Sequence, residues 1–144
     1  MKSCFAYEND GYYKEVNLPL GFKARIRSLN DNDFSEIRKK AGFKFNLTKD
    51  VIEKMKKDKD FQPDYEMDIE VFRKEQTVAS LTDPVGTSYE KGGAGWDLKD
   101  AKGNTVEVTR KNIDLILPEI RIAIDDAILE FKKANDDLLE LGKN

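Results

Sequence analysis

The chain has 144 residues, close to the usual size of one domain, and it is long enough to bury a core unaided. Charged residues make up 37% of it, against a globular norm of about 25%, but the formal net charge of -3 does not favour a general nucleic-acid binder. No apolar run approaches the roughly 20 residues that span a bilayer, and the polar stretch after Met1-Lys2 does not resemble a secretory signal. We therefore expect a single cytoplasmic domain over residues 1–144.

Residues 5–29 have the features of β-strands. Asn9-Asp10-Gly11 predicts a tight hairpin turn between residues 5–7 and 12–16, because these residue types tolerate a positive φ. Pro19-Leu20-Gly21 marks a second break. Beyond it, apolar residues alternate with basic ones, and this period of two predicts a strand with one buried and one basic face. The basic positions are Lys23, Arg25 and Arg27.

Three helices are expected between residues 30 and 84. Asn30 or Asp31 can cap the first helix, and Gly42 ends it. The second begins near Thr48, with Val51, Ile52 and Met55 facing inward. Pro63-Asp64 can open the third, which stops at residues 81–84.

The remainder of the chain begins with a glycine-rich loop at 83–95, which we expect to be flexible. A second short hairpin is predicted near 96–108, followed by a short helix that Thr109 caps and Pro118 ends. Apolar residues at three- and four-residue steps then predict a long amphipathic C-terminal helix. The expected fold is α+β and mostly helical, with an N-terminal β-hairpin or meander and the last helix at its centre.

Residues suited to catalysis are scarce. The chain contains no histidine and a single cysteine, Cys4, so Cys/His zinc sites cannot form within one chain and the commonest general base is missing. The paired aspartates at 125–126 and 136–137 diverge on a helix and do not converge on one ion. The glycines at 92–95 precede a predicted strand, whereas a phosphate cradle needs a helix start. We expect no catalytic residue, no metal site and no cofactor.

Charge is unevenly distributed along the chain. Residues 23–59 hold 12 basic and 6 acidic residues, whereas residues 119–140 hold 3 basic and 7 acidic ones. Two poles of opposite sign could guide head-to-tail self-association or dock a charged partner, or they could be solvated helix faces that differ in sign.

The candidate binding residues combine this basic region with the only tryptophan. They are Lys23, Arg25, Arg27, Arg38 and Trp96. Trp96 either anchors the second hairpin on the core or forms an exposed hot spot for a partner protein. Few aromatic residues interleave with the basic ones, so a base-stacking platform for nucleic acid is not indicated.

Three stretches of the sequence together resemble the phage tail assembly chaperones of the XkdN-like group. The first, residues 22–40, is a basic strand followed by a capped helix that ends Glu36-Ile37-Arg38-Lys39-Lys40. The second, residues 72–84, is a helix that ends at Asp83-Pro84. In the third, a hairpin around Trp96 and Gly103 leads to Asn112-Ile113 and Leu117-Pro118. The resemblance covers roughly residues 22–118.

The resemblance implies a non-enzymatic protein that binds the long tape-measure protein and keeps it soluble until the tail tube assembles around it. It also implies that the protein can self-associate and that it is absent from the finished virion. Two alternatives remain open. One is a structural tail protein or a head–tail connector or terminator. The other is a small nucleic-acid-associated regulator that uses the basic region 23–59.

Overall fold

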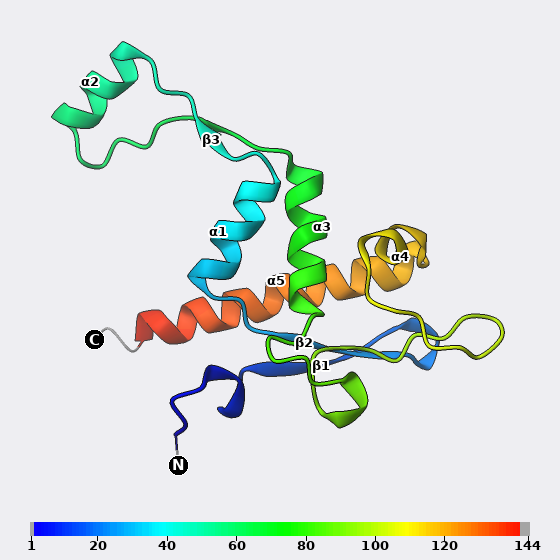
Figure 1. Ribbon diagram of the computed structural model, residues 1–144. Coiled ribbons are helices and arrows are strands. Elements are labelled where there is room, and N and C mark those ends of the chain that lie inside the picture. Colours follow the sequence, from blue (N-terminus) through cyan, green and yellow to red (C-terminus); the bar gives the residue numbers. More distant parts are fainter. Residues whose placement is uncertain (1, 142–144) are drawn as a thin grey trace.

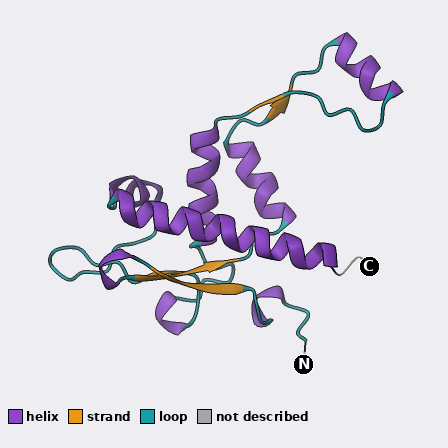
Figure 2. Ribbon diagram, turned by 180° about the vertical axis from the view of Figure 1, so that it is seen from behind, coloured by secondary structure: helices purple, strands orange, loops and turns teal. Residues whose placement is uncertain are grey.

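The computed structural model describes residues 2–141, and the side chains of residues 2–136. The fold is α+β, as the sequence predicts: helix α5 crosses one face of a small antiparallel sheet, and helices α1 and α3 stand beside each other on the same side (Figure 1). A thin arm continues from the far ends of α1 and α3, away from the sheet (Figures 1 and 2). We call residues 43–67 the arm and the rest of the described chain the body.

The sheet of the body has three strands in the order β1-β2-β5, with both neighbouring pairs antiparallel. The strands are β1 (Tyr13–Asn17), β2 (Lys23–Arg27) and β5 (Gly95–Trp96). The N-terminal hairpin is confirmed, but it lies one segment later than predicted. Its connection is the 3-10 turn Pro19–Gly21, whereas residues before Asn9-Asp10-Gly11 form a 3-10 turn at Ala6–Glu8 instead of a strand.

The core lies between this sheet and α5 (Pro118–Leu141). Ala24 and Ile26 of β2 are completely buried, as is Ile124 of α5. The alternation along β2 sends its small and branched apolar residues to one face, and the three- and four-residue spacing in α5 presents a matching stripe. The stripe consists of Ile120, Ile124, Ala127, Ile128 and Phe131.

Helices α1 (Asp31–Lys40) and α3 (Ile69–Ser80) begin at side-chain caps. Asn30 and Asp33 form a complete capping box, in which each side chain accepts the other residue's backbone N–H. Asp68 caps α3 by accepting from Val71 N–H. The third predicted helix therefore exists, but it begins after Asp68 and not at Pro63.

The segment between β5 and α5 packs against α3. Residues 97–106 fold back on themselves through one isolated bridge, Lys99 with Thr105, so the second predicted hairpin is short and irregular. Thr109 caps α4 (Arg110–Leu115), as predicted. From α4, Arg110 donates two hydrogen bonds to the buried Glu75 of α3, which Lys40 of α1 also approaches at 3.6 Å. One carboxylate thus joins three helices.

The packing of α5 against the sheet predicts a sharp contrast between two isoleucines of the same helix. Ile124→Ala removes a fully buried side chain and leaves a cavity, so we expect the free energy of unfolding to fall by about 2–4 kcal/mol. Ile122 is 58% exposed, so Ile122→Ala should change it by less than about 0.5 kcal/mol. Urea unfolding measures both values. Equal losses in the two variants would contradict the described packing.

Candidate protein-binding surface

The arm comprises residues 43–67 and is a two-stranded ribbon that carries a helix at its end. Strands β3 (Lys44–Phe45) and β4 (Tyr65–Glu66) pair antiparallel, and α2 (Lys49–Lys57) lies beyond them. At the base, Asp68 donates its backbone N–H to the carbonyl of Ala41 over 2.9 Å. The chain therefore leaves the body and returns to it at nearly the same place.

Aromatic rings stabilise the ribbon. The ring centroid of Phe43 lies 5.1 Å from that of Phe45 and 5.2 Å from that of Tyr65. Such ring pairs add about 0.5–1.5 kcal/mol beyond the area they bury. The cluster is local to the arm and does not extend to the core beneath α5.

Apolar side chains on the arm stay in solvent. We define the arm face as five residues that are each 40–55% exposed: Phe45, Leu47, Ile52, Met55 and Tyr65. The sequence predicts Ile52 and Met55 to point inward, and this prediction is wrong. Helix α2 forms where predicted, capped by Thr48, but it stands beyond the ribbon, and only Val51 is partly covered. Phe45 and Tyr65 are partners across the ribbon, and Ile52 and Met55 lie on one side of α2. Exposed apolar patches mark sites of protein–protein interaction.

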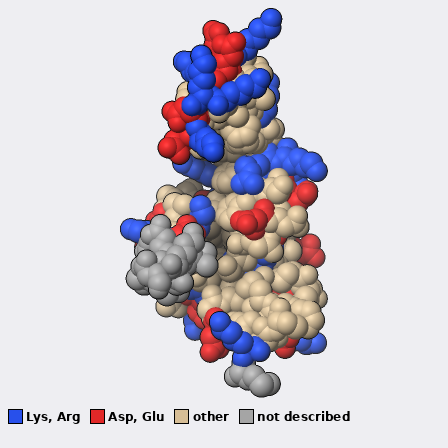
Figure 3. Space-filling view, turned by 90° about the vertical axis from the view of Figure 1, so that its left-hand side faces the viewer, with Lys and Arg blue, Asp and Glu red and all other residues tan. Residues whose placement is uncertain are grey.

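Lysines border the apolar side of α2. At 3.6 residues per turn, Lys54 and Lys56 fall on either side of Val51, Ile52 and Met55. The two acids of the helix, Asp50 and Glu53, fall on the opposite side. Figure 3 shows lysine and arginine side chains over the arm and over its junction with the body, with acidic side chains and uncharged atoms among them. The apolar side of α2 has one lysine along each of its edges.

Among the residues singled out from the sequence, Arg25 holds a loop. Its Nη1 donates to the carbonyl oxygens of Tyr89 and Gly93, at 2.8 and 2.9 Å. The guanidinium also lies 4.7 Å from the centroid of the Tyr89 ring and pairs with Glu15. The predicted basic face of β2 is therefore covered at this point by residues 82–95, which we name the strap.

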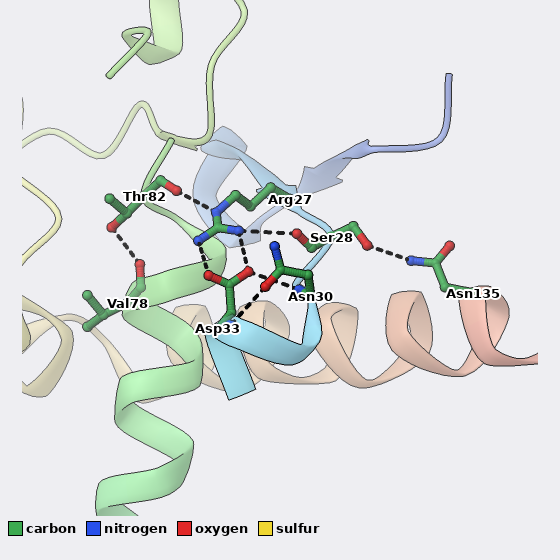
Figure 4. Close-up of polar contacts among 7 residues, drawn as sticks. All are labelled: Arg27, Ser28, Asn30, Asp33, Val78, Thr82 and Asn135. Carbon is green, nitrogen blue, oxygen red and sulfur yellow. Dashed lines mark hydrogen bonds and ion pairs between the residues drawn. The ribbon is translucent and has the colours of Figure 1, made fainter. Parts of the chain in front are cut away.

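Arg27 is buried at the centre of a polar cluster between β2, α1 and the strap (Figure 4). Its Nε donates to the carbonyl of Thr82 over 2.7 Å, and its Nη1 donates to Asp33 over 2.9 Å. Burial alone raises the pKa of Asp33, but the hydrogen bond and charge of Arg27 and the Asn30 backbone N–H bring it below its ordinary value. The pair fixes α1 on the sheet.

The other three candidate residues lie apart. Trp96 is 2% exposed and donates its indole N–H to the carbonyl of Val106 over 2.7 Å, so it anchors the core. Lys23 is exposed beside Asp97, whose carboxylate accepts the Lys23 backbone N–H. Arg38 is half-buried and lines a cavity of about 420 Å³ between α1, α3 and α5. The structure does not bring the five candidates together on one surface.

Asp83 organises the strap. Its carboxylate accepts hydrogen bonds from the backbone N–H groups of Val85, Thr87 and Ala94 and from the hydroxyl of Tyr13 on β1. Burial raises the pKa of Asp83, but these four donors outweigh burial and lower it below its ordinary value. Burial and the neighbouring carboxylate raise the pKa of Tyr13. The flexibility predicted for residues 83–95 stays a prediction.

Asp83→Asn should remove the anchor of the strap. It should also make the free energy of unfolding depend less on pH in the acidic range. A neutral amide accepts these bonds less well, so the free energy of unfolding at neutral pH should fall by about 1–3 kcal/mol. The low folded-state pKa stabilises the protein above about pH 4, and this stabilisation is lost as the pH falls through that pKa. The wild type should therefore lose stability more steeply on acidification than the variant.

Urea midpoints measured from about pH 7 down to about pH 2 test this expectation. Asp10→Asn, at an exposed aspartate outside the strap, is the matched control and should follow the wild type. Parallel curves for the wild type and Asp83→Asn would show that the Asp83 carboxylate does not hold the strap.

Comparison with protein-family models, with curated proteins and with solved structures finds no match to this chain. Within residues 2–141, no helix is both long and apolar enough to cross a membrane. Among residues 2–136, no cluster of three or more histidine, cysteine, aspartate or glutamate side chains is arranged to hold a metal ion. The arm face, which the sequence does not single out, exposes five apolar side chains that take no part in the core.

Proposed function

We propose that this protein is a tail assembly chaperone that binds an amphipathic helix of its client through the arm face. The observation that carries the proposal is the exposure of the five apolar side chains of the arm face, each 40–55% exposed. An apolar face of this kind buries the stripe of a partner helix, whose anchors recur at three- and four-residue steps.

The borders of the arm face favour a particular client helix. Lys54 and Lys56 flank the apolar centre of α2, so acidic residues beside the client's apolar stripe would face lysines. Charges at the rim of an interface speed association and select the orientation, whereas the apolar centre supplies most of the affinity. The expected client segment is an amphipathic helix with aspartate or glutamate along its edges.

The resemblance of residues 22–118 to XkdN-like chaperones supports the tape-measure protein as the client. The cytoplasm of the bacterial host is the corresponding place of action. The nucleic-acid alternative has less support, because the basic region 23–59 does not form one surface. Arg25 and Arg27 are engaged with the strap and with Asp33, whereas the lysines of α2 lie on the arm.

Co-expression with the tape-measure protein tests the proposal. We expect the client to become soluble and to elute with this chain on gel filtration.

The double variant Ile52→Asp with Met55→Asp places two charges in the centre of the arm face. It should weaken client binding by about 2 kcal/mol, roughly thirtyfold. The body should be unaffected, because both side chains lie on the arm.

The matched control is Ile122→Asp with Leu129→Asp, which charges two exposed apolar residues of α5 and should leave client binding intact. If the client is equally soluble without this chain and no complex elutes, the proposal fails. Mass analysis of purified particles distinguishes a virion component, which is present in a fixed copy number, from a chaperone, which is absent.

A further inference from the structure

The outer face of α5 is a second exposed apolar surface with a charged border. Ile122 and Leu129 lie seven residues apart on one side of the helix and are 58% and 61% exposed. Glu119, Asp126 and Glu130 are exposed along one edge of the same face. Figure 2 shows α5 in front of the other elements of the body, with none of them over it.

The acids of this face are not used within the described part of the chain. Glu119, Asp126 and Glu130 form no ion pair with another residue among 2–136, whereas the inward-facing Asp125 pairs with Arg121 and accepts from Thr77. Carboxylates that lie beside an exposed apolar stripe favour a cationic amphipathic partner.

We propose that the arm face of one copy docks on the outer face of α5 in a second copy, head to tail. The apolar side of α2 would cover Ile122 and Leu129, with Lys54 and Lys56 toward the acids beside them. The sizes match, because nine residues of α2 extend about 13 Å and the stripe from Ile122 to Leu129 about 10 Å.

The contact joins different copies, because the arm extends away from the body and from α5 in both views (Figures 1 and 2). Unlike surfaces meet, so a pair of copies keeps one free arm face and one free α5 face, and association continues into a ring or an open chain. One short helix buries less than a standard stable interface. Association should therefore be weak, and salt should weaken it further.

The inference does not depend on the proposed function, but it has a consequence for it. The client and a second copy would use the same arm face, so client binding would dissociate the self-assembled form. The outer face of α5 serves self-association alone.

Paired charge reversals test the contact. One variant carries Lys54→Glu and Lys56→Glu on the arm, and the other carries Asp126→Lys and Glu130→Lys on α5. Sedimentation velocity is measured over a concentration series at low and high salt. The wild type should sediment faster as concentration rises at low salt, and each variant alone should associate at least about tenfold more weakly. An equimolar mixture should regain association, because the arm that now carries glutamates meets the α5 face that now carries lysines.

A wild type that remains monomeric at the highest attainable concentration overturns the inference. So does a mixture that associates no better than its components. Trp96 fluorescence identifies any variant that has lost its fold, since this side chain is buried in the body. The α5 variant should still capture the client, so failure of self-association and failure of the chaperone proposal give different results.

Discussion

The burial of one stripe of α5 against one face of the sheet is the constraint on which the remaining structure depends. Ile120, Ile124 and Ile128 fill the space over Ala24 and Ile26, which leaves the opposite face of β2 with its arginines to be covered. The strap covers that face, and its carbonyl oxygens accept from Arg25 and Arg27. An arginine-rich strand is stable here because its charges meet carbonyls and carboxylates.

The same arrangement leaves the arm outside the body. Arg27–Asp33 fixes α1 on the sheet, and Glu75 joins α1, α3 and α4, so both helices that carry the arm are held below its base. The arm adds a small aromatic cluster of its own but contributes nothing to the core under α5. Its apolar side chains and those on the outer face of α5 thus remain exposed, with Lys54 and Lys56 beside the former and Glu119, Asp126 and Glu130 beside the latter.

Local signals in the sequence predicted much of this fold. Asn30, Thr48 and Thr109 cap helices where expected, because a cap depends on residues three positions apart. The sequence places the N-terminal hairpin one segment too early, because a turn signal at residues 9–11 does not show which segment pairs with β1, and the structure pairs β1 with β2. The sequence also presents Arg25 and Arg27 as a basic surface, because the strap that covers them lies more than 50 residues later in the chain. Ile52 and Met55 fit the pattern of a core helix, and periodicity alone does not reveal that α2 lacks a partner.

We expect the body to fold without the arm, because residues 43–67 contribute no side chain to the core beneath α5. Ala41 and Asp68 are already joined by a backbone hydrogen bond, so residues 43–67 can be replaced by a short glycine–serine linker. The most direct measurement is denaturant unfolding of this deletion variant, followed by the fluorescence of the buried Trp96. We expect one cooperative transition from a native, buried tryptophan signal. A variant with an exposed tryptophan and no transition would show that the body depends on the arm.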